Sequence, residues 1–241
     1  MAFAIVGHRG AMAEAPENTI ASYRVAEEVG VDELETDVRI SSDGQLFMLH
    51  DATLDRTAAD AAGKDLGPVA RLPWSQISAV DVGGGERVPT LEQMYRATTR
   101  FVQLEIKDLA AIEALTDFFH RHADYAERTI LTGFSVEAMA TVAQKLPHIP
   151  RGIIVSKWTD AEKHPGGYLQ LLKDTGSSRI HSGGEGLTAE IVERLHEEGV
   201  PVHGWPTRTQ DDLRHWIELG VDGTTGDDPR TVRRWLAEEL G

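Results

Sequence analysis

The sequence predicts an α/β fold, a closed (β/α)8 barrel, and two observations carry this prediction. Short apolar runs alternate with helical patterns through most of the 241 residues, which is typical of a parallel sheet with right-handed crossovers. Eight such strand–helix pairs can be counted along the chain, and eight is the number that closes a barrel. An open, doubly wound sheet is the alternative, but no glycine-rich fingerprint follows the first strand.

The strand candidates are apolar runs that are too short for helices. The run at 151–155 is the weakest of them because it is short. In chain order the predicted strands span residues 3–8, 32–39, 101–106, 129–133, 151–155, 178–182, 201–205 and 220–225.

Helical patterns follow these strands, and their ends have a physical basis. Asn18 and Ser135 can cap the free amide groups of a first helical turn, and Pro229 suits a first turn because it has no amide hydrogen to satisfy. Gly30 and Gly220 follow helical patterns at positions where a left-handed residue is often needed. The predicted helices span residues 18–29, 91–98, 110–122, 135–145, 166–174, 188–198, 209–218 and 229–239.

Residues 51–90 interrupt the alternation, and we call this segment the excursion. It is rich in Gly, Ala, Asp and Pro, with only a short apolar pattern between Trp74 and Val80. We interpret it as a long loop after the second strand that packs over the barrel mouth, not as an independent domain. The prediction is therefore one domain over residues 1–241.

Composition narrows the class of partner. The net charge of −15 argues against nucleic acid, which needs a basic surface, but not against a small anionic substrate. The chain has no cysteine, so disulfides and thiolate–metal sites are excluded and a cytoplasmic location is expected. We see no signal peptide and no apolar stretch long enough for a membrane span. No feature of the sequence predicts an oligomeric state.

Ionisable residues lie at the ends of the first three barrel strands. They are too numerous for a hydrophobic core, where charges must be paired or bound to metal. Because active sites of such barrels lie at the carboxyl ends of the strands, we expect these side chains to converge. They form four groups: His8-Arg9-Gly10, Glu35 with Asp37, His50-Asp51, and Glu105 with Lys107.

A hairpin is predicted after the second strand. Asp43-Gly44 between two alternating apolar runs is a strong signal for a two-residue turn. With that turn, Asp37 lies directly opposite His50, and Glu35 shares the face of Asp37 because side chains alternate along a strand. We therefore expect Glu35, Asp37 and His50 to form one cluster.

These motifs resemble those of the glycerophosphodiester phosphodiesterases. The resemblance covers almost the whole chain and is most specific in its first 107 residues. It implies a TIM barrel, one divalent metal ion, and conversion of glycerophosphodiesters to glycerol 3-phosphate and an alcohol. The matching motifs are His8-Arg9-Gly10, Pro16-Glu17-Asn18-Thr19, Glu35-x-Asp37-Val38, Asp43-Gly44, His50-Asp51, Leu54-x-Arg56-Thr57, Gly84-Gly85, Val88-Pro89-Thr90-Leu91 and Glu105-Ile106-Lys107.

Two later stretches depart from the family pattern. Where the seventh strand usually ends Trp-Thr-Val-Asn, this chain has Trp205-Pro206-Thr207-Arg208, and the usual Thr-Asp before the last helix is Gly226-Asp227. We expect neither stretch to touch the metal or the imidazoles, but both to alter the pocket wall and the preference for the alcohol.

Glu35, Asp37 and Glu105 are the predicted metal ligands. A ligand set made up entirely of oxygen atoms favours Mg²⁺ or Ca²⁺ over zinc. Three carboxylates and a divalent ion sum to −1, and Arg9 with Lys107 brings the sum to +1, which a phosphodiester monoanion neutralises. Without the ion, the site would repel its substrate.

His8 and His50 are the predicted acid–base pair, and the resemblance supports both as catalytic. Arg9 and Lys107 are the predicted phosphate-binding cations: the arginine can donate two parallel hydrogen bonds to a phosphate, and the lysine supplies a point charge. Trp205 is a candidate for the part of the pocket wall that contacts glycerol. The attacking group is either water or the 2-hydroxyl of the glycerol itself.

Two other functions fit part of this pattern. A larger lipid substrate, as for lysophospholipase D-like or sphingomyelinase D-like relatives, would need an apolar lip, and the excursion offers few apolar residues for one. A non-catalytic barrel that binds a phosphorylated ligand would not need both histidines and all three acidic ligands.

Overall fold

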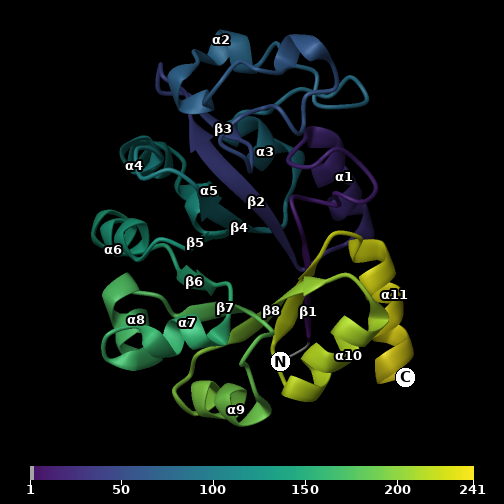
Figure 1. Ribbon diagram of the computed structural model, residues 1–241, viewed down its shortest axis with the longest axis vertical. Helices are drawn as coiled ribbons and strands as arrows, with labels where there is room; N and C mark the ends of the chain where they lie inside the picture. Colours follow the sequence, from purple (N-terminus) through teal and green to yellow (C-terminus); the bar gives the residue numbers. More distant parts are fainter. Residues whose placement is uncertain (1–2) are drawn as a thin grey trace.

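A closed ring of eight parallel strands organises the described part of the chain, residues 3–241 of a computed structural model (Figure 1). The ring closes because the first strand pairs with both the second and the last. The ring strands are β1 (Ala4–Gly7), β2 (Glu33–Ile40), β4 (Phe101–Ile106), β5 (Thr129–Gly133), β6 (Arg151–Val155), β7 (Arg179–Gly183), β8 (Val202–Thr207) and β9 (Gly223–Gly226). The predicted (β/α)8 barrel is confirmed.

Helices surround this ring, and each predicted helix is present to within two residues at each end. They are α1 (Ile20–Val29), α3 (Leu91–Ala97), α4 (Ala111–Arg121), α6 (Val136–Lys145), α8 (Gly167–Thr175), α9 (Ala189–Glu197), α10 (Gln210–Leu219) and α11 (Pro229–Leu240). Short unpredicted helices add to them: α2 (Trp74–Ile77), α5 (Ala123–Ala126), α7 (Trp158–Lys163) and single 3-10 turns at Ala61–Gly63 and Val69–Arg71. Within residues 3–241, no helix is long and apolar enough to cross a membrane.

The helix ends follow the predicted capping chemistry, with one exception. Ser135 accepts a hydrogen bond from the amide of Ala138, and Gly30 ends α1 in the left-handed region at φ 78°. The prediction that Asn18 caps α1 is wrong. Thr19 is the N-cap and accepts from the amide of Ser22, whereas Asn18 is buried beneath the strand ends.

The hairpin after β2 forms, but its turn is longer than predicted. Ser41 and Gln45 close it with a backbone hydrogen bond of 3.0 Å, which leaves residues 42–44 in the loop. Gly44 takes the left-handed conformation at φ 87°, as the third residue of a three-residue hairpin loop often does. The carboxylate of Asp43 accepts from the Ser41 hydroxyl and from the Trp74 amide, which ties the turn to the excursion.

The longer turn shifts the pairing register by one residue. Strand β3 (Leu46–Met48) pairs antiparallel to β2 with Met48 opposite Val38, and the amide of Leu49 bonds to the Asp37 carbonyl. Leu49, not His50, therefore lies opposite Asp37, and the predicted pairing is wrong. The ladder ends at Met48, so His50 is free of strand alternation and can turn toward the barrel.

The excursion after β3 has an apolar cluster of its own. Phe47 of β3 and Leu49, just after the end of β3, begin this cluster, and Ile77 of α2 is fully buried in it. The 51–90 segment lies beside β3, α1 and α3 in Figure 1, at one end of the long axis of the molecule. Its first residues follow His50 directly and thus start at the carboxyl end of the barrel.

Candidate active site

Three buried carboxylates lie together where β2 and β4 approach the carboxyl end of the barrel. The parallel register sets Asp37 directly beside Glu105, and Glu35 precedes Asp37 by two residues on the same face. One oxygen from each of the three carboxylates lies within 4.8 Å of the others. The predicted cluster of Glu35, Asp37 and Glu105 is thus present in the structure.

The mutual repulsion of these three carboxylates contributes to raised pKa values for Glu35 and Glu105. Burial, together with the Asp37 charge, raises the pKa of Glu35 to about 8. Burial and Asp37 also raise the pKa of Glu105. Burial acts against the Asp37 charge as well, but Lys107 and Arg9 outweigh it and lower the pKa of that carboxyl. The cluster therefore keeps a proton near neutral pH unless a further cation balances it.

The donor set fits a hard divalent cation. Lys107 Nζ lies 2.5 Å from Glu105 Oε1 and 3.1 Å from Asp37 Oδ1. The second contact is off the direction of a hydrogen bond, so Asp37 Oδ1 is buried with no hydrogen-bond partner among residues 3–241. A buried, unbonded carboxylate oxygen beside two other carboxylates is the arrangement expected of a Mg²⁺ or Ca²⁺ ligand.

Asn18 holds the central carboxylate, a role that the sequence did not reveal. Its side-chain amide donates to Asp37 Oδ2 at 2.8 Å, and its carbonyl oxygen accepts from the Thr36 hydroxyl at 2.7 Å. Asn18 adopts φ 55°, in the left-handed region, which turns the chain just before α1. A buried asparagine that makes these bonds fixes the rotamer of Asp37.

His8, at the end of β1, is held between two carboxylates. Its Nδ1 lies 2.6 Å from Asp227 Oδ1, and its Nε2 lies 3.8 Å from Glu35 Oε2. Burial opposes the charged imidazole, but Asp227 and Glu35 outweigh burial and raise the pKa of His8. We expected the Gly226-Asp227 stretch to lie away from the imidazoles, and this expectation is wrong for Asp227.

His50 has a carboxylate partner of its own in the next residue. Its Nδ1 lies 2.7 Å from Asp51 Oδ1, and its backbone carbonyl accepts two hydrogen bonds from the Arg39 guanidinium, at 3.1 and 2.7 Å. Burial lowers the pKa of His50, although Asp37 and Asp51 act in the opposite direction. These contacts direct His50 toward the site although the hairpin register differs from the predicted one.

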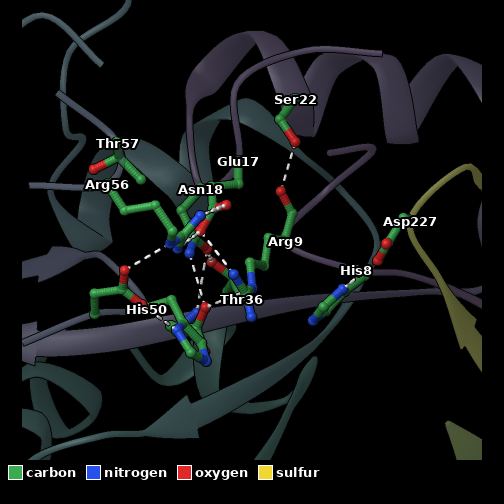
Figure 2. Close-up of polar contacts among 12 residues, drawn as sticks. His8, Arg9, Glu17, Asn18, Ser22, Thr36, His50, Arg56, Thr57 and Asp227 are labelled. Atoms are coloured by element: carbon green, nitrogen blue, oxygen red, sulfur yellow. Dashed lines mark hydrogen bonds and ion pairs between the residues drawn. The ribbon is translucent and has the colours of Figure 1, made fainter. Parts of the chain in front are cut away.

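A chain of ion pairs joins His50 to Arg9. Arg56 of the excursion donates from Nε to Asp51 and from both terminal nitrogens to Glu17. Glu17 in turn accepts from Arg9 at 2.7 Å. Figure 2 shows Arg56 above Arg9 and His50, with His8 and Asp227 on the opposite side of Arg9. The Leu54-x-Arg56-Thr57 and Glu17 motifs were visible in the sequence, but their contacts were not.

Arg9 keeps hydrogen-bonding capacity for an anion. Its backbone amide donates to Glu35 Oε2 at 2.9 Å, and its Nε, 3.4 Å from Asp37 Oδ2, has no hydrogen-bond partner in the described chain. The guanidinium is largely buried, and the Asp37 and Glu17 charges outweigh burial and raise its pKa. A fixed cation of this kind beside an acidic cluster favours a phosphate group.

Six of the eight predicted site residues line one cavity of about 240 Å³. Asp37 and Lys107 do not line the cavity, but Lys107 contacts Glu105, which does. Trp205 lines the cavity, as predicted, and its ring meets that of Phe134 edge to face, with centroids 5.9 Å apart. The lining residues are His8, Arg9, Glu35, His50, Gln103, Glu105, Phe134, Ile154, His181, Trp205, Pro206, Arg208 and Thr225.

Comparison with known proteins agrees with this geometry. The profile of the glycerophosphoryl diester phosphodiesterase family matches residues 8–231. The chain belongs to this family. Membership confirms the resemblance noted in the sequence and makes the protein an enzyme that hydrolyses glycerophosphodiesters.

Individual members of the family match over nearly their full length. A glycerophosphodiester phosphodiesterase of Caldanaerobacter subterraneus is 29% identical over 95% of both chains. The crystal structure of a glycerophosphodiester phosphodiesterase from Agrobacterium tumefaciens is 28% identical, with a TM-score of 0.73 over 95% of this chain and 98% of the other. A phosphodiesterase from Oleispira antarctica, solved with the product sn-glycerol-3-phosphate, has a TM-score of 0.86 at 22% identity over 97% and 96% of the two chains.

Proposed function

We propose that this protein hydrolyses glycerophosphodiesters to glycerol 3-phosphate and an alcohol with one divalent cation, Mg²⁺ or Ca²⁺, held by Glu35, Asp37 and Glu105. The observation that carries the proposal is the buried three-carboxylate cluster, whose ligand atoms lie within 4.8 Å of one another. The Oleispira relative binds sn-glycerol-3-phosphate, which supports the same product here.

The charges around the cavity support a monoanionic substrate. With a divalent cation, the three carboxylates sum to −1, and Arg9 and Lys107 bring the sum to +1. When bound, the cation polarises the phosphoryl oxygens and stabilises the negative charge that grows on them. Arg9 and Lys107 add fixed positive charge at the same place, where little reorganisation is needed during the reaction.

His8 and His50 are the proposed proton carriers. One imidazole removes a proton from the attacking hydroxyl, and the other donates a proton to the departing alkoxide. In each ring Nδ1 lies within hydrogen-bond distance of a carboxylate, Asp227 for His8 and Asp51 for His50, whereas Nε2 of His8 lies 3.8 Å from Glu35, beyond that distance. Such a contact fixes the ring orientation and leaves the second nitrogen of each imidazole for the substrate.

The dimensions of the cavity support a small diester. Its volume of about 240 Å³ is below the usual range for a drug-sized ligand. Trp205 forms part of the wall, and we propose that its ring contacts the substrate.

The proton-transfer roles are tested by His8→Ala and His50→Ala, each assayed with a soluble glycerophosphodiester. Each variant is expected to lower kcat by about 10²-fold or more, while circular dichroism stays unchanged. His148→Ala, on an exposed loop, is the matched control and should keep normal turnover. A His8 or His50 variant with near-normal kcat would show that the residue is structural.

A further inference from the structure

The active-site cavity has a closed end and an open end. Gln103 and His181 are only 2% and 3% exposed and form its floor. Gln103 lies two residues before Glu105 on β4, hence deeper in the barrel. At the other end Phe134 is 44% exposed and Arg208 is exposed, so these residues form the lip of the cavity.

The two ends differ in charge. The carboxylates that line the cavity, Glu35 and Glu105, belong to the metal cluster. The lip consists of Phe134, Trp205, Pro206 and Arg208, and Arg208 is its one charged member among the described lining residues.

The backbone of Arg208 is anchored, and its guanidinium interacts with the Asp212 and Asp227 carboxylates only at a distance. Its backbone amide donates to Asp212 Oδ2 at 2.9 Å, at the start of α10. Its guanidinium forms no ion pair with any residue of the 3–241 range within 4.0 Å. The positive charge of Arg208 acts on Asp227, the carboxylate partner of His8. There it adds to the effect of His8 in lowering the pKa of Asp227.

We propose, on the basis of the function proposed above, that the lip is the binding subsite for the leaving alcohol and that Arg208 selects alcohols that carry a negative charge. The glycerol moiety is small and constant in size, and the closed, polar floor suits it. The alcohol is the variable part of the substrate and needs the open end.

The alternative occupant of this lip is a cationic alcohol such as choline. Trp205 and Phe134 could attract a quaternary ammonium group through their ring faces. However, these rings pack against each other at an interplanar angle of 85°, so they do not form an open cage, and no described carboxylate lines the lip to pair with the cation. The guanidinium of Arg208 would repel such a group, whereas it would attract a carboxylate or phosphate.

Three synthetic diesters of glycerol 3-phosphate test this inference. Their alcohols are 3-hydroxypropionate, which is anionic, 3,3-dimethylbutanol, which is neutral, and choline, which has the shape of dimethylbutanol with a positive charge. At low ionic strength, wild-type kcat/KM is expected to fall in that order, with about a fivefold or greater difference between the anionic and cationic diesters. The difference should shrink at high salt.

Variants at position 208 assign the preference to the side chain. Arg208→Asn should bring the ratio of the kcat/KM values for the anionic and cationic diesters close to one, and Arg208→Glu should reverse the preference. An indirect effect through Asp227 and His8 would lower both kcat/KM values together and leave their ratio unchanged. Arg96→Asn, which removes a positive charge from the exposed side of α3, is the matched control and should keep the wild-type ratio.

The outcomes separate this inference from the function on which it rests. If the wild type hydrolyses all three diesters with equal kcat/KM, or if Arg208→Asn keeps the wild-type ratio, the subsite assignment is overturned and the phosphodiesterase function stands. If the wild type, assayed with Mg²⁺ or Ca²⁺, hydrolyses none of them, the proposed function fails and this inference fails with it.

Discussion

Arg56 connects the excursion to two side chains of the proposed active site, Arg9 and His50. Its guanidinium makes three hydrogen bonds to the carboxylates of Glu17 and Asp51, at 2.6 to 2.7 Å. Those carboxylates contact Arg9 and His50 respectively. The planar guanidinium of Arg56 therefore orients the proposed phosphate-binding cation, Arg9, and the proposed proton carrier, His50, at the same time. A lysine cannot do this with its single ammonium group.

We expect Arg56→Lys to lower kcat by about tenfold or more, because partners that orient active-site groups typically contribute on this scale. Steady-state kinetics on a soluble diester measures the effect. Arg87→Lys is the matched control, since Arg87 lies in the same excursion and, among residues 3–241, its side chain pairs only with that of Asp81. Equal kcat for Arg56→Lys and wild type would mean that the Arg56 bonds do not orient His50 or Arg9.

Asp227 gives a second prediction at the scale of one residue. Asp227→Asn keeps the shape of the side chain but removes the charge that lies 2.6 Å from His8 Nδ1. We expect kcat to fall by about tenfold or more, because the amide can hold the ring in the wrong tautomer. Asp228→Asn, at the N-cap of α11, should affect stability but not kcat. A normal kcat for Asp227→Asn would remove Asp227 from the catalytic arrangement.

The sequence predicted the residues at the strand ends better than their partners. His8, Glu35 and Glu105 could be assigned because strand alternation and barrel geometry bring such positions together. The contacts of Asn18 and Asp227 could not be predicted, because they depend on side-chain rotamers and on loops that meet only in the closed barrel.

At the scale of elements, the hairpin shows where local sequence rules are insufficient. An Asp-Gly pair favours a two-residue turn, but in this chain Asp43 is held by Ser41 and by Trp74 of the excursion. The local bond from Ser41 and the tertiary bond from Trp74 stabilise a three-residue loop, which shifts the register by one residue. His50 reaches the site all the same, because Arg39 binds its backbone carbonyl beyond the end of β3.

Strands β7 and β8 contribute a buried histidine pair that should make stability depend on pH. His181 and His203 lie with ring centroids 5.4 Å apart, and burial, with a smaller contribution from Arg179, lowers the pKa of His203 to about 3 from an ordinary value of 6.5. Between those pH values the unfolded chain binds more protons than the folded one. Stability is therefore lost as the pH falls below about 6.5, by up to about 1.4 kcal/mol per pH unit for each such histidine.

We expect His203→Gln to weaken this dependence. Urea unfolding, followed by tryptophan fluorescence between about pH 7 and pH 5, should show a smaller loss of unfolding free energy for His203→Gln than for the wild type. His148→Gln, at an exposed position, is the control and should follow the wild-type curve. An identical pH dependence for His203→Gln and wild type would contradict the assignment of His203 as a neutral, buried residue.

At the scale of the whole molecule, the barrel was predictable because its signal is repeated. The prediction of any one strand–helix unit is weak by itself. The regular alternation of these units along the chain, however, is compatible with only a few fold topologies. The excursion was less predictable, since Phe47 and Leu49 pack against residues that are far apart in the sequence, such as Ile77.

The net charge of −15 also has to be considered for the whole molecule. The surface field opposes the approach of an anionic substrate, but screening limits it to about 8 Å at physiological salt. The charge balance within the cavity therefore decides binding, and that balance depends on the cation proposed at Glu35, Asp37 and Glu105.

The most direct test is to remove and restore this cation. Protein stripped of metal with a chelator and then exchanged into chelator-free buffer is assayed for diester hydrolysis, alone and after addition of Mg²⁺ or Ca²⁺. Thermal unfolding is followed in parallel, because a cation that binds only the folded state must raise Tm. Glu105→Gln is the matched variant, since it removes one ligand charge while keeping the size of the side chain.

We expect the stripped protein to lack activity, and Mg²⁺ or Ca²⁺ to restore hydrolysis and raise Tm. Glu105→Gln should show a smaller increase in Tm at the same cation concentration. Full hydrolysis by thoroughly stripped protein, with no change in Tm when either cation is added, would contradict a metal site at the three carboxylates.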